Sequence, residues 1–99
     1  MTTQESKELH YNNEVETVER TLYTLAGYAD PDEKISIDTL GDFGGYDLGE
    51  LQKIAKNAKE AVKYNKRLNA VSKKMLARRI IRDKVHFLVA QAISRRGFF

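Results

Sequence analysis

The residues of this sequence best suited to chemistry are lysines and arginines, and they gather in its second half. Residues 1–50 hold twelve acidic and three basic residues, a balance of −9, whereas residues 51–99 hold fourteen basic and two acidic ones, a balance of +12. The formal net charge of +3 hides this separation. A charge asymmetry of this size indicates either a charged partner or the docking of one half on the other.

Phosphate contact is the chemistry that this basic segment favours. Lysine and arginine side chains neutralise backbone phosphates and release counterions without reading a base sequence. Arg78, Arg79 and Arg82 fall close together on a helical period, so that two or three guanidinium groups can hold neighbouring phosphates. We therefore expect contacts to DNA or RNA from Lys63, Lys66, Arg67, Lys73, Lys74, Arg78, Arg79 and Arg82. The plainer interpretation is a solvated helix face that pairs with the acidic half.

Catalytic and metal chemistry have little support in the sequence. The chain has no cysteine, which excludes thiolate chemistry and a disulfide framework. His10 and His86 are far apart, and the acidic residues lack the spacing of a calcium-binding loop. Asp42-Phe43-Gly44 spells the metal-binding triplet of protein kinases, but 99 residues cannot hold a kinase. We predict a protein that is not an enzyme and has no metal site and no cofactor.

The elements that must position the cations are expected to be helices. An apolar stripe at helical spacing, from Tyr11 through Val18 to Leu25, predicts a first helix at about 9–27, after a frayed tail at 1–8. Asp47 and Glu50 have the spacing of a capping box and predict a second helix at about 47–65. Between these helices lies an irregular, acidic, glycine-containing connector, in which residues 34–38 could form a short strand or, equally, residues 36–40 a two-turn helix.

The second half of the chain leaves two alternatives open. No glycine or proline occurs from Glu50 to Arg96, so one long C-terminal helix in an oligomer is possible. We favour a turn at residues 65–72, after which Ser72 caps a last helix at about 72–96 and Gly97 stops it. Within this helix the apolar segment 85–93 could instead be a buried strand, because valine, isoleucine and phenylalanine also favour strands.

The expected architecture is an all-α, three-helix, single domain that spans residues 1–99. The last helix is apolar on two sides, which is typical of a helix that is either central to the core or shared with another subunit. Because only two other helices are expected, the shared alternative gains weight. We therefore predict a homo-oligomer and an oligomer or partner interface made of Leu76, Ile80, Phe87, Leu88, Phe98 and Phe99. Phe98 could also fold back on Ile93 as part of the cap of the last helix.

The sequence thus favours a small accessory or regulatory protein that binds nucleic acid through a basic helical face. The alternative is an oligomeric protein-binding adaptor or inhibitor that uses the apolar last helix and the terminal Phe98-Phe99. Attachment to anionic membranes is a weaker third hypothesis, since few apolar residues accompany the arginines. No apolar run reaches the roughly 18 residues that a membrane span needs, and no signal region is evident, so we expect a cytoplasmic protein.

Overall fold

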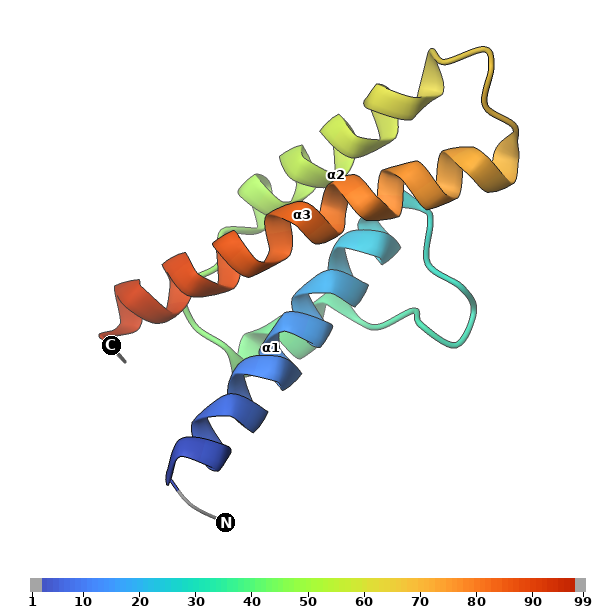
Figure 1. Cartoon of the computed structure of the whole chain (residues 1–99). Helices are drawn as coiled ribbons and strands as arrows, with labels where there is room; N and C mark the ends of the chain where they lie inside the picture. Colours follow the sequence, from blue (N-terminus) through green and yellow to red (C-terminus); the bar gives the residue numbers. More distant parts are fainter. Residues whose placement is uncertain (1–2, 98–99) are drawn as a thin grey trace.

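The computed structural model describes residues 3–97, apart from the side chain of Asp42. The chain forms α1 (Thr3–Ala26), the short 3₁₀ helix η1 (Ile37–Asp42), α2 (Leu48–Lys63) and α3 (Ala70–Arg96), and no strand occurs in the described residues (Figure 1). The all-α, three-helix fold predicted from the sequence is therefore confirmed.

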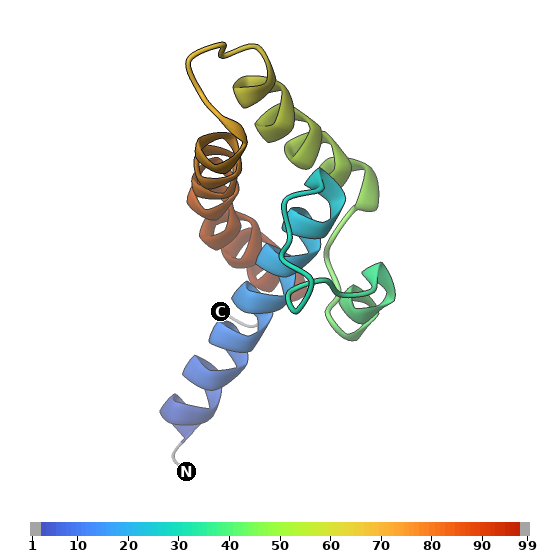
Figure 2. The same ribbon diagram turned by 90° about the vertical axis from the view of Figure 1, so that its right-hand side faces the viewer.

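The three helices share one apolar core. Val18 and Leu22 of α1, Leu51 and Ala58 of α2, and Val85 of α3 belong to a single cluster of buried side chains. Each helix contacts the other two, so the core lies where α1 crosses the α2–α3 hairpin. Figure 2 shows that α1 extends beyond this crossing, and residues 3–10 are exposed along their whole length.

The first helix begins earlier than the sequence analysis predicted. We expected residues 1–8 to be a frayed tail, but α1 starts at Thr3. Residues 4–8 are mostly good helix formers, and once the core has fixed the later turns, each added residue gains a backbone hydrogen bond at little cost. A hydrogen bond of 3.4 Å from Gln4 Nε2 to Glu8 Oε1 supports this first stretch.

A turn separates α2 from α3, as favoured above, and excludes the single long helix. The residue that caps α3 is Asn69, not Ser72: the Asn69 side chain accepts a hydrogen bond of 2.8 Å from the Ser72 backbone N–H. Asn65 accepts another, of 3.1 Å, from the Arg67 N–H inside the turn. Residues 85–93 are helical, so the strand alternative for this segment is wrong.

The remaining boundaries follow local signals. Asp47 caps α2 by accepting a hydrogen bond of 2.9 Å from the Gly49 N–H, and Gly97 ends α3 with a φ of 78°. The alternation at 34–38 forms no strand; Ser36 instead caps the 3₁₀ helix η1.

Gly45 has a φ of 96°, and a Cβ there would lie 3.2 Å from the Ala92 carbonyl oxygen, so glycine lets the connector pass close to α3.

Candidate nucleic-acid interface

Three of the cations assigned to phosphate contact form ion pairs within the chain. Lys74 Nζ pairs with Asp30, and Arg82 Nε lies 3.3 Å from Glu19 Oε1. Arg78 makes a two-pronged contact with Glu33, at 2.8 Å from Nη1 to Oε1 and 2.6 Å from Nη2 to Oε2. The acidic connector therefore docks on the first half of α3, as the plainer interpretation of the charge asymmetry required.

Arg78 is the centre of this ion-pair cluster. Its guanidinium carbon lies 4.3 Å from the centre of the Tyr23 ring, and its side chain is only 19% exposed. Burial by itself lowers the pKa of Arg78, but the hydrogen bond to Glu33 and the adjacent Tyr23 raise it further than burial lowers it. The hydrogen bond from Lys74 holds the pKa of Asp30 below its ordinary value. Arg78 is thus committed to a structural role.

Four of the other predicted cations remain available to a partner. Lys63, Lys66, Arg67 and Arg79 are exposed, and none of them forms an ion pair within the described residues, whereas Lys73 is half-buried. The Lys63 ammonium lies 5.5 Å from the centre of the Tyr64 ring, and Tyr64 is 75% exposed. The end of the molecule formed by the α2–α3 turn therefore presents free positive charge beside an exposed aromatic ring.

The outer side of α2 extends this cationic end of the molecule. Lys53, Lys56, Lys59 and Lys63 are exposed and follow one another at steps of three or four residues. Glu60 is the one acidic residue among them, and it lies 4.0 Å from Lys56 Nζ. We call the exposed set on α2 and the turn the turn-end basic face: Lys53, Lys56, Lys59, Lys63, Lys66 and Arg67.

The residues assigned to an interface are only partly available. Phe87 and Leu76 are 63% and 37% exposed, and Ile80 is half-buried against the core. Leu88 is 7% exposed and packs in the core, so its assignment to an interface is corrected: it faces the chain's own helices. Phe98 and Phe99, including the proposed contact of Phe98 with Ile93, lie outside the described residues.

A buried polar cluster escaped the sequence analysis. Glu14 is fully buried in α1, and both of its carboxylate oxygens lie 2.7 Å from Nη2 of Arg96 in the last turn of α3. The Tyr46 hydroxyl from the connector also donates to Glu14. Glu14 stands three residues after Tyr11 and four before Val18, which places it on the apolar stripe of α1. An acidic residue at this spacing was the signal in the sequence that could have predicted the burial of Glu14.

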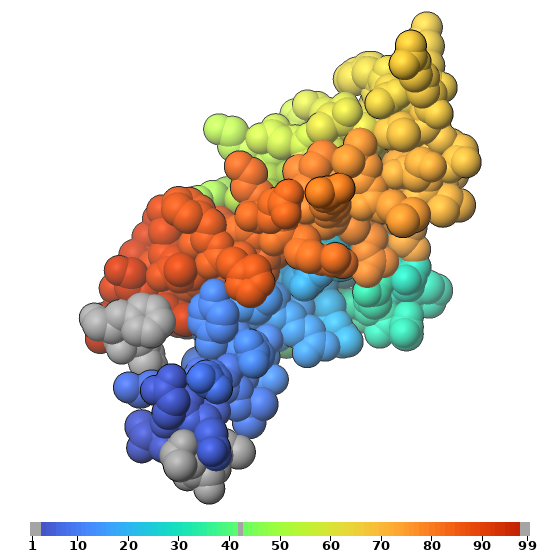
Figure 3. Space-filling view, viewed as in Figure 1, coloured from blue at the N-terminus to red at the C-terminus, as the bar shows by residue number. Residues whose placement is uncertain are grey.

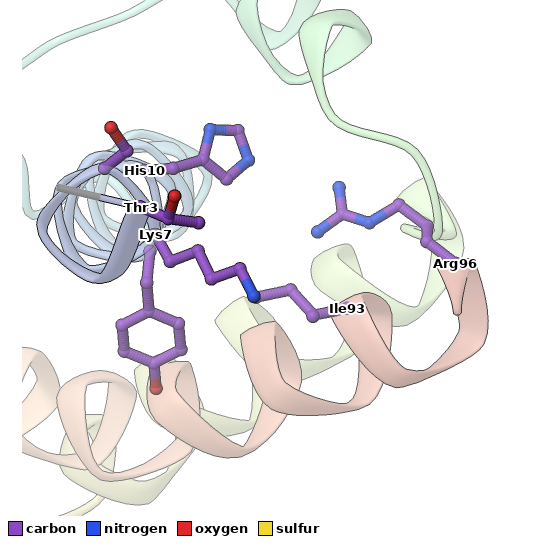
Figure 4. Close-up of a pocket in the computed structure, with 7 residues that line it drawn as sticks. Thr3, Lys7, His10, Ile93 and Arg96 are labelled. Atoms are coloured by element: carbon purple, nitrogen blue, oxygen red, sulfur yellow. The ribbon is translucent and has the colours of Figure 1, made fainter. Parts of the chain in front are cut away.

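A small pocket of about 200 Å³ lies beside this cluster. Figure 4 shows Lys7 and His10 from α1 and Ile93 and Arg96 from α3 around it. Because Glu14 already holds Arg96, this cation has little to offer an anionic ligand in the pocket. Nδ1 of His86, the other histidine, lies 3.1 Å from the Tyr11 hydroxyl oxygen.

The described residues contain no group of three or more histidine, cysteine or acidic side chains able to hold a metal ion. Among residues 3–97, no helix has the length and apolar character to cross a membrane. Comparison with known proteins adds no relative: no family model, no curated protein and no solved structure matches this chain significantly.

Proposed function

We propose that this chain is a small accessory or regulatory protein that binds DNA or RNA through the turn-end basic face, with phosphate contacts and no catalysis. One observation carries the proposal: exposed cations gather on α2 and the turn, and of these only Lys56 forms an ion pair, of 4.0 Å with Glu60, within the described residues. A cation already paired with a carboxylate has less to gain from a phosphate, so Lys74, Arg78 and Arg82 contribute less than the sequence suggested.

The dimensions of the face fit a phosphate backbone. From Lys53 to Lys63 α2 rises about 15 Å, and a duplex carries about nine charges over that length. Contact with about four phosphates gives a slope of log K against log salt of about −3.6. Raising the salt fourfold should then weaken binding by about 150-fold. The exposed Tyr64 offers a ring on which an unpaired base can stack, which favours single-stranded nucleic acid.

The test is fluorescence anisotropy with a labelled duplex and a labelled single strand across a salt series. The variant Lys63→Gln/Arg67→Gln removes two charges from the turn-end basic face. It should flatten the salt slope by about 1.8 for the duplex and by about 1.4 for the single strand. The matched control is Lys7→Gln/Arg95→Gln, which removes the same two kinds of charge from exposed sites at the opposite end of the molecule and should leave the slope unchanged (Figure 1).

Two results would overturn the proposal. One is the absence of binding at low salt to either nucleic acid, where even sequence-independent contact is detectable. The other is an equal loss in both double variants, which would mean that net charge alone causes the binding. Either result would favour the alternative, a protein-binding adaptor or inhibitor, which the exposed Leu76 and Phe87 support.

A further inference from the structure

Two acids of the connector cover the cations in the first turns of α3. Asp30 pairs with Lys74, and its Oδ2 lies 3.3 Å from Nη1 of Arg78. Glu33 holds the Arg78 guanidinium in the two-pronged contact described above. In Figure 3 this part of the connector (turquoise) lies directly against the start of α3 (yellow to orange). We call residues 30–33 the connector strap.

The connector strap is held on α3 by charge. Within the described residues, every hydrogen bond and ion pair between the strap and α3 comes from the carboxylate of Asp30 or Glu33. Glu33 also accepts a hydrogen bond of 2.9 Å from the Asp30 backbone N–H, which keeps the two carboxylates together. Pro31 and Asp32 are exposed, and no strap residue belongs to the apolar core. The strap can therefore leave α3 without exposing the core.

The covered cations border an open groove on α3. The groove has a volume of about 660 Å³, and Lys74, Arg78, Arg79 and Arg82 line it together with Asp83. Arg79 is exposed and forms no ion pair within the described residues. Arg78 stands eight residues after the start of α3, which is about 12 Å along the helix. A nucleic acid bound at the turn-end basic face can therefore reach this groove.

The side chains that the strap occupies are those that would hold phosphates. The fork of an arginine binds a carboxylate or a phosphate with the same two-pronged geometry. We propose that Lys74, Arg78 and Arg79 form a second phosphate-binding row, which the connector strap inhibits by occupying Lys74 and Arg78. This inference rests on the proposed nucleic-acid function and adds its regulation. A tethered carboxylate competes well because it is always close by, and a cation that it holds neutralises no phosphate.

The test is the salt series with the labelled duplex, applied to the strap variant Asp30→Asn/Glu33→Gln. Both substitutions keep the shape of the side chain and remove its charge. Lys74 and Arg78 then become free, so the slope of log K against log salt should steepen by about 1.8, from about −3.6 to about −5.4. A fourfold rise in salt should weaken binding by this variant about 1,800-fold, against about 150-fold for the wild type.

The matched control is Asp32→Asn/Asp38→Asn, which removes two exposed connector acids that form no ion pair within the described residues. It raises the net charge equally and should leave the slope unchanged. Lys74→Gln should also leave the wild-type slope unchanged, but in the strap variant it should remove about 0.9 of the gain. Asp30→Asn alone changes a carboxylate that is 44% exposed and frees only Lys74. It should steepen the slope by about 0.9, and it serves as the test if the double variant does not fold.

A strap variant with the slope of the wild type, or an equal change in the control, overturns the inhibition. A gain that survives Lys74→Gln overturns the assignment to α3. If Lys63→Gln/Arg67→Gln flattens the slope and the strap variant does not steepen it, the proposed function stands and this inference fails. If only the strap variant binds, the strap controls binding and the turn-end basic face does not carry it. If neither the wild type nor the strap variant binds, both proposals are overturned.

Discussion

Replacing Arg96 with methionine should destabilise the protein more than any change on its basic surface. Methionine keeps the aliphatic part of the side chain and suits a helix, so the change removes mainly the guanidinium group. Glu14, which is fully buried, loses both contacts of 2.7 Å and, among the described residues, keeps only the hydroxyl of Tyr46 and the nearby His10 ring. A carboxylate is then left in the protein interior without its main cation.

The expected magnitude follows from this geometry. Removing one partner of a buried ion pair costs about 3–5 kcal/mol. For a domain of this size each kcal/mol lowers the melting temperature by about 4–8 °C, so a loss of about 12–40 °C is expected. The double variant Glu14→Leu/Arg96→Met should be more stable than Arg96→Met alone, because no charge then remains buried without a partner.

Thermal and urea unfolding followed by circular dichroism would measure these losses. The matched control is Arg95→Met, one residue earlier, where the exposed side chain makes a single contact of 3.4 Å with the Gly45 carbonyl oxygen. That change should cost less than about 0.5 kcal/mol. A loss below about 1 kcal/mol in Arg96→Met, or a double variant whose loss equals the sum of the two single ones, would refute the reasoning.

Three further predictions concern pH and the connector. Lys74 lowers the pKa of Asp30, so their contact stabilises the fold above pH 3.8 and is lost as the pH falls below that value. The melting temperature of Asp30→Asn should therefore fall less on acidification than that of the wild type. Burial raises the pKa of Tyr23 and Tyr46, so the free energy of unfolding should stay constant below pH 10.0 and decline above it. In urea unfolding, Tyr46→Phe should show a smaller decline than the wild type. Gly45→Ala should cost about 1–3 kcal/mol, since alanine resists a positive φ and its Cβ would press on Ala92; an unchanged unfolding free energy would contradict this.

Local patterns in the sequence were sufficient to predict the helices. The apolar stripes, the capping residue Asp47 and the terminal Gly97 act within one or two turns of the chain, so their effect is visible without knowing the fold. The turn before α3 was predicted for the same reason, but the prediction that Ser72 caps α3 was wrong, because the cap is Asn69. Both side chains can cap a helix, and the path of the backbone before α3 determined that Asn69 does so.

The tertiary structure determined which charged residues form ion pairs. Lys74, Arg78 and Arg82 look alike in sequence to Lys63, Lys66 and Arg67, yet the former meet acids more than 40 residues away and the latter meet none within the described chain. Whether a cation is paired depends on which face of its helix meets which other element. Packing around the core determines which helix faces meet, and the periodic pattern of one helix does not contain this information. For the same reason Leu88 and Glu14 became buried while Phe87 stayed exposed.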